Sequence, residues 1–165
     1  MQSKEFLTSL LDHNRSLIMP LIEDLHDQPL AFPTSRGGNH ALWVTGHITF
    51  TLAWVVDEFL QGRPNRLQHW KELFDTGTEP IAEAAVYPTF DEVLQTCRAC
   101  HQECVDLLNA ISEEELDDKV DCPDGFESFV GTKRLCFRTI ANHWLFHFGQ
   151  LADIRRSLGR KRLMA

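Results

Sequence analysis

Two histidines near the C-terminus have the spacing of a helix-borne metal site. His143 and His147 are four residues apart, so on a helix their imidazoles lie one above the other on the same face. That face also carries Ile140 and Leu151, so both imidazoles are expected to point into an apolar interior. An unsatisfied polar group costs about 1–3 kcal/mol there. A shared metal ion would satisfy both rings; hydrogen bonds to Ser, Thr or Asn of a facing helix are the alternative.

A third histidine favours the metal ion. His47 falls on the apolar stripe of an earlier predicted helix, between Val44 and Thr51. Three neutral imidazole nitrogens from two helices, with a fourth position left open, form the ligand set of a catalytic metal site. We therefore predict that His47, His143 and His147 bind one divalent metal ion.

Other polar residues near these histidines have more ordinary explanations. His40 lies two turns before His47 and is either a second-shell or lid residue or, as we prefer, a solvent-exposed histidine in a capping turn. Gln150 follows His147 by one turn and either orients a ligand or substrate or makes a local hydrogen bond. We expect the remaining histidines to lie at the surface or to bond locally: His13, His26, His69 and His101.

A cluster of cysteines is the competing candidate site. Cys97, Cys100 and Cys104 form the pattern C-x-x-C-x-x-x-C on the inward stripe of a predicted helix. No strand precedes them, so the context of a thioredoxin-type motif is missing. Free cysteine on such a stripe behaves as a small apolar residue, and we predict core packing for all three.

Four amphipathic helices are predicted to position these side chains. They cover residues 3–26, 39–62 with Asn39 as the N-cap, a segment from the capping box of Thr89 and Glu92 to Leu108, and 132–159. The connection over 62–88 is long enough to cross the length of a bundle and should contain a short helix at 66–74. We therefore predict an all-α fold: a four-helix bundle with a long crossover between helices 2 and 3, which run parallel, in a single domain over residues 1–165.

Composition excludes several classes of protein. The formal net charge of the 165 residues is -8, which disfavours nucleic acid as a partner. No apolar run approaches the roughly 20 residues that span a bilayer, so we expect no membrane contact. The five cysteines are an odd number and are unevenly spaced. They indicate a reducing compartment instead of a disulfide framework, and we expect a soluble, cytoplasmic protein.

Two segments of the sequence resemble a known family. The segments NHALWVTGHITFTLAWVVDEFLQGRPNR and HWLFHFGQLADIRRSLGR are similar to those of the DinB-like superfamily, which includes the YfiT-type proteins. The resemblance covers nearly the whole chain. Its specific part is the Gly-His pair at residues 46–47 together with H-x-x-x-H-x-G-Q-L-x-x-x-R-R from residue 143.

The resemblance implies a function as well as a fold. It implies a metal triad of His47, His143 and His147, a divalent ion such as zinc or nickel (iron and manganese being further options), and a homodimer. Characterised members are thiol-dependent S-transferases or isomerases that use mycothiol, bacillithiol or glutathione. The expected partner is therefore a small-molecule substrate, in particular a low-molecular-weight thiol. A metal-dependent hydrolase and a non-catalytic metal-binding or stress-response protein stay open as alternatives.

Overall fold

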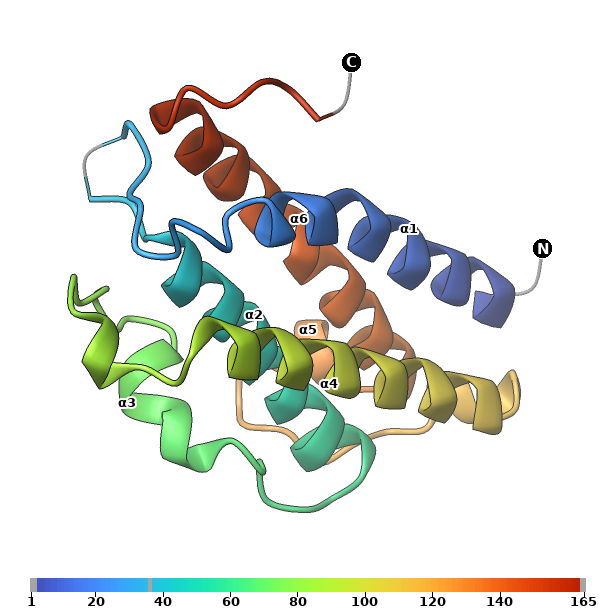
Figure 1. The fold of residues 1–165 in the computed structure, drawn as a ribbon. Helices are drawn as coiled ribbons and strands as arrows, with labels where there is room; N and C mark the ends of the chain where they lie inside the picture. The colour runs from blue at the N-terminus through green and yellow to red at the C-terminus, as the bar shows by residue number, and fades with distance from the viewer. Residues whose placement is uncertain (1–2, 36, 164–165) are drawn as a thin grey trace.

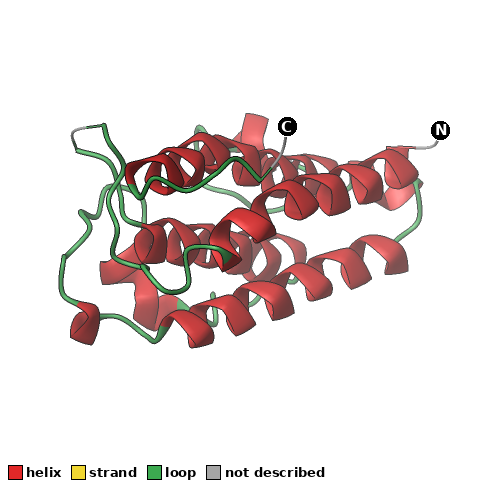
Figure 2. Cartoon of the chain, turned by 45° about the horizontal axis from the view of Figure 1, so that its top comes forward, coloured by secondary structure: helices red, strands yellow, loops and turns green. Residues whose placement is uncertain are grey.

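The computed structural model describes residues 3–35 and 37–163, so the predicted domain limits at residues 1 and 165 lie outside the described residues. All regular structure in this part of the chain is helical. Four long helices lie along roughly one axis, with loops gathered at the ends (Figure 2). None of the described helices is both long and apolar enough to cross a membrane.

The four long helices match the predicted segments closely. They are α1 (Ser3–Glu23), α2 (Ala41–Trp54), α4 (Phe90–Ala110) and α6 (Lys133–Ser157). A π-helical segment, Val55–Leu60, continues α2 directly, and Gly62 with its positive φ of 62° ends it as predicted. Thr89 and Thr132 cap α4 and α6 through side-chain oxygens that accept from backbone N–H groups three residues on.

The connection between α2 and α4 runs the length of the bundle. It contains a 3₁₀ turn, Gln68–Trp70, and the short helix α3 (Lys71–Phe74), where the sequence predicted a short helix. In Figure 1, α2 and α4 both begin at the left and run to the right, whereas α1 and α6 run the opposite way. Helices 2 and 3 of the predicted bundle are therefore parallel, and the predicted crossover is confirmed.

Helix α2 differs from the prediction of an amphipathic helix, because it is buried on every face. All its residues except Thr51 and Trp54 are buried, and it packs between α4, α6 and the crossover helix α3. Phe74 of α3 covers the outer face of α2 at Gly46. A Cβ built on Gly46 would come within 2.5 Å of three atoms of that ring, so only glycine permits this approach.

The N-cap of α2 was also predicted one residue too early. His40, not Asn39, holds this position, since its Nδ1 accepts the Trp43 N–H at 3.0 Å. His40 is not in solvent as expected: it is completely buried, its ring packs edge-on against Phe32 and Tyr87, and its Nε2 lies 3.1 Å from the Ile81 carbonyl oxygen. It therefore joins the start of α2 to the crossover.

Candidate metal centre

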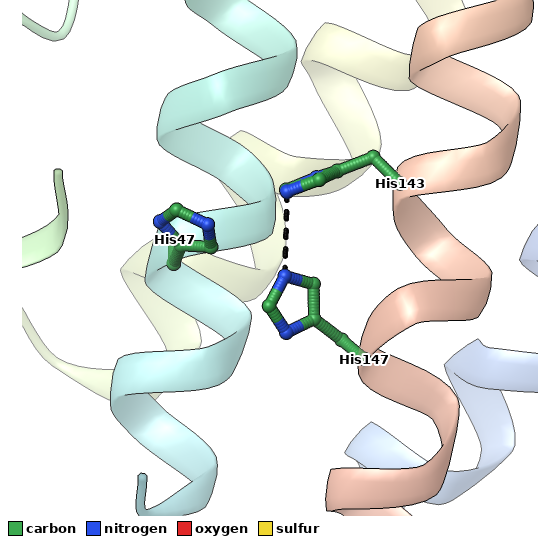
Figure 3. Close-up of side chains that lie close together, drawn as sticks. All are labelled: His47, His143 and His147. Atoms are coloured by element: carbon green, nitrogen blue, oxygen red, sulfur yellow. Dashed lines mark hydrogen bonds between the residues drawn. The ribbon is translucent and has the colours of Figure 1, made fainter. Parts of the chain in front are cut away.

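Helices α2 and α6 bring the three predicted histidines together. The ligating nitrogens of His47, His143 and His147 all lie within 4.8 Å of one another, and no other His, Cys, Asp or Glu of the described chain belongs to the group. Figure 3 shows His143 and His147 reaching from α6 toward α2, with His47 facing them. The imidazole centroids are 4.8–5.1 Å apart.

Two hydrogen bonds fix which ring nitrogen His47 and His147 present to a metal ion. His47 Nδ1 lies 2.7 Å from the Phe74 carbonyl oxygen, which can only accept, so Nδ1 carries the proton and Nε2 keeps its lone pair. His147 Nδ1 lies 2.7 Å from Gln150 Oε1, which also accepts, so the same nitrogen carries the proton in His147. Trp43 stacks on His47 at 4.8 Å and holds its ring plane. Outer partners of this kind are typical of metal-binding histidines.

The spacing on α6 suits a tetrahedral ion. His143 Nε2 and His147 Nε2 are 3.3 Å apart, the dashed line in Figure 3. With metal–nitrogen bonds of about 2.0–2.1 Å, two ligands of a tetrahedral site lie about 3.4 Å apart. All three residues therefore fit a divalent cation by donor type, His47 and His147 fit it by tautomer, and the pair on α6 fits it by separation.

Burial keeps these imidazoles neutral, as metal ligands must be. His47 and His147 are only 6% and 9% exposed. Desolvation, assisted by the neighbouring imidazoles, lowers the pKa of His143 to about 3. Desolvation likewise lowers the pKa of His147 to about 4 and lowers that of His47, against the opposing effect of their hydrogen bonds. Free lone pairs are thus available at neutral pH.

The centre opens on a cavity of about 670 Å³ that His143 helps to line. Asp75, the residue after Phe74, lines the same cavity, and its negative charge acts on His47. The sequence did not point to Asp75, because it follows a four-residue helix in the crossover and has no periodic relation to the histidines. The Phe74 carbonyl was missed for the same reason, since any residue type supplies one.

The other polar residues considered in the sequence lie in three kinds of place: at the centre, at the surface and in the interior. Gln150 bonds His147 and so belongs to the centre. His13, His26 and His69 are exposed, as predicted. For His101 the prediction of a surface or locally bonded residue was wrong: its side chain is buried against Trp144, and its Nδ1 has no hydrogen-bond partner.

The cysteine cluster is not a competing centre. Cys97, Cys100 and Cys104 are buried and free, as the prediction of core packing requires. Burial raises the pKa of the Cys97 thiol to about 11 and that of Cys100 to about 12. The pKa of Cys104 is raised further by the same cause. Thiols with such pKa values stay protonated and are poor ligands and nucleophiles at neutral pH.

Comparison with known proteins assigns the chain to a family. A search of curated protein sequences returned no match. The family model of the DinB superfamily matches residues 10–151, which include α2, α4 and both His143 and His147 on α6. Because this match covers most of the sequence and every histidine of the centre, the chain belongs to the DinB superfamily.

Proposed function

We propose that this protein is a metal-dependent enzyme that holds one divalent cation on His47, His143 and His147 and acts on a small thiol. The observation that carries the proposal is the convergence of three imidazoles within 4.8 Å in a chain of the DinB superfamily, for which the resemblance implies a metal triad. Imidazole ligands suit zinc and nickel, and also iron or manganese, so the donor set does not select one metal.

The residues around the centre support thiol chemistry. A divalent cation with an open position binds a thiol sulfur and holds it as thiolate at neutral pH. The chain itself does the orienting: the Phe74 carbonyl and Gln150 keep the Nε2 lone pairs of His47 and His147 directed inward. The cavity beside His143 gives an electrophile a place within reach of that sulfur.

Elemental analysis of the purified protein tests the ligand assignment. We expect one equivalent of a divalent metal in the parent and none in His47→Ala, His143→Ala or His147→Ala. His26→Ala is the matched control, since His26 is an exposed histidine paired with Asp91. Full metal content in any of the three ligand variants would rule out that residue as a ligand.

A thiol panel tests the activity. Mycothiol, bacillithiol and glutathione are each combined with an epoxide and with chlorodinitrobenzene, and thiol consumption is followed with and without chelator. We expect metal-dependent consumption of one thiol. Its absence across the panel would refute the transferase.

Metal-assisted hydrolysis is the second candidate, and Asp75 is the observation that favours it. A water bound at the open position would have a pKa near about 7, and Asp75 is a carboxylate in the same cavity that can accept its proton. Asp75→Asn separates the two: it should abolish ester hydrolysis but leave thiol transfer largely intact, because the cation alone lowers the pKa of a thiol. If chelation only lowers the melting temperature and no turnover of either kind exists, the protein is a non-catalytic metal binder.

We further propose a homodimer, as the family resemblance implies. Sedimentation of the purified protein as a dimer at micromolar concentration would support this proposal, and sedimentation as a monomer at that concentration would refute it.

A further inference from the structure

The wall of the cavity beside His143 is largely aromatic. It is formed by the end of α2, the crossover, the short helix α5 (Glu127–Val130) and α6. Five aromatic side chains from these elements line it: Phe50, Trp54, Phe126, Phe129 and Phe146. Its volume of about 670 Å³ lies within the range of sites for small organic molecules.

The aromatic wall is held in place by specific contacts. Thr139 of α6 donates to the Phe129 carbonyl at 2.6 Å, and Arg138 donates to the Ser128 carbonyl at 2.6 Å, so α5 is fastened to α6 beside the metal centre. Phe126 meets Trp54 edge-on at 6.1 Å across the cavity. The wall is thus a preformed surface, not a loose loop.

Several of these rings are unusually exposed. Phe126, Phe129 and Phe146 are 44%, 55% and 74% accessible, and Phe146 stands edge-on to the His143 ring at 6.4 Å. Exposed apolar rings that surround a concave site mark a place where a ligand is bound. Here the ligand would cover these rings and lie next to a predicted metal ligand.

The charged side chains of the cavity carry a net negative charge. Two carboxylates, Glu58 and Asp75, oppose one ammonium group, Lys71. Glu58 accepts from Trp54 Nε1 at 2.9 Å and Asp75 from the Thr76 N–H at 2.7 Å, so both carboxylates are anchored. Without a metal ion an anionic ligand would meet net negative charge, which a divalent cation on the histidines would offset. An uncharged ligand gains the full benefit of the aromatic surface in either state.

We infer that this cavity binds an uncharged aromatic or similarly bulky apolar molecule, with its reactive atom toward His143. This inference rests on the proposed function and names the class of its second substrate: the electrophile is a neutral, apolar molecule that the aromatic wall can cover.

Two fluorescent probes that differ by one charge test the inference. N-phenyl-1-naphthylamine is neutral, and 8-anilino-1-naphthalenesulfonate adds a sulfonate to nearly the same rings. Both are titrated into the metal-loaded protein and into the chelated protein. We expect the chelated protein to bind the neutral probe at least about tenfold more tightly than the anionic one, because apolar burial is retained and repulsion removed. In the metal-loaded protein the cation offsets the carboxylates, so the affinities of the two probes should differ less.

Three phenylalanine variants locate the bound probe. Phe129→Ala and Phe146→Ala should each weaken binding of the neutral probe about tenfold, while Phe6→Ala should leave it unchanged. Phe6 is a matched control, since it is 55% exposed like Phe129 but lies on α1 and outside the cavity lining. All three rings are exposed, so their loss should not unfold the protein.

Three results would overturn the inference. They are equal or tighter binding of the anionic probe to the chelated protein, equal effects of Phe6→Ala and Phe129→Ala, and loss of probe binding as the protein dimerises, which would mean that a second copy covers the cavity. The titration requires no turnover. Failure of thiol consumption with normal probe binding would therefore refute only the proposed function, and metal-dependent thiol transfer without probe binding would refute only this inference.

Discussion

Replacing Gly46 by alanine tests whether the residues that hold the metal centre in place affect metal binding, without removing any of the three histidines. Gly46 precedes His47 but cannot itself bind a metal. A Cβ at this position would lie within 2.5 Å of three Phe74 ring atoms, whereas ordinary contacts begin at 3.4 Å. Phe74 is fully buried between Trp70 and Tyr87, so its ring cannot swing away freely. We expect α3 to shift by about 1 Å, as overpacked cores do when no void absorbs the added group.

The shift should weaken metal binding, because Phe74 of α3 also positions His47. The Phe74 carbonyl accepts from His47 Nδ1 at 2.7 Å, and a displacement of about 1 Å takes this bond beyond hydrogen-bonding range. Loss of an outer partner of a metal-binding histidine costs about 10–100-fold in metal affinity. Overpacking should also lower the free energy of unfolding of the metal-free protein by about 1–3 kcal/mol.

Chelator competition measures the metal affinity, and urea unfolding measures stability. Gly149→Ala is the matched control: Gly149 lies on α6 between His147 and Gln150, and a Cβ there would meet no atom within 4 Å. That variant should bind metal normally and be as stable as the parent or more so, since alanine favours a helix. Adding Phe74→Leu to Gly46→Ala should restore part of the affinity, because the smaller side chain leaves the carbonyl in place.

Equal metal affinity in the Gly46 and Gly149 variants would refute the reasoning. It would mean that the Phe74 carbonyl does not orient His47, or that α3 can move without lowering the metal affinity. A loss that Phe74→Leu does not relieve would mean that the effect is not steric.

Three further predictions concern the centre and the core. Gln150→Ala removes the acceptor of His147 Nδ1–H and should weaken metal binding about tenfold in chelator competition, whereas Gln150→Glu should not. Burial lowers the pKa of His101 to about 4, from 6.5 in the unfolded chain. Between pH 6.5 and pH 4 the His101 side chain is therefore protonated mainly in the unfolded chain. The metal-free protein should thus lose stability as pH falls from 6.5 toward 4, and His101→Phe should recover about 2 kcal/mol of the loss between pH 7 and pH 5 in urea unfolding. Asp57→Asn should lower the free energy of unfolding by about 3 kcal/mol, because the fully buried Asp57 carboxylate accepts from Arg63 and Arg66.

Each of these has a contradicting result. Equal affinity of the alanine and glutamate variants at position 150 would mean that His147 needs no partner. An unchanged pH dependence in His101→Phe would assign the acid sensitivity to the histidines of the metal centre, whose pKa values are also lowered. An Asp57→Asn variant as stable as the parent would show that the two arginines, which are partly exposed, are equally well solvated without the carboxylate.

The parts of the site that lie within one helix were predictable. His143 and His147 had to share a face because four residues make about one helical turn, and Ile140 and Leu151 showed that the face is apolar. The capping residue Thr89 and the inward cysteines were also predictable, since a capping box and a stripe are both defined by local spacing. His101 was not, because the sequence shows no partner and the contact that buries it comes from Trp144 of another helix.

The sequence alone determined the four helices, their limits within a few residues, and the pair of imidazoles on α6. Only the tertiary structure decided how α2 is turned, because a helix that is apolar on every face has no polar side to show which residues point where. That rotation brings His47 to the α6 pair, and it depends on Phe74 packing against Gly46 from a crossover far along the chain. The cavity beside His143 likewise exists only where α2, the crossover, α5 and α6 meet, and no local sequence pattern predicts that these elements come together.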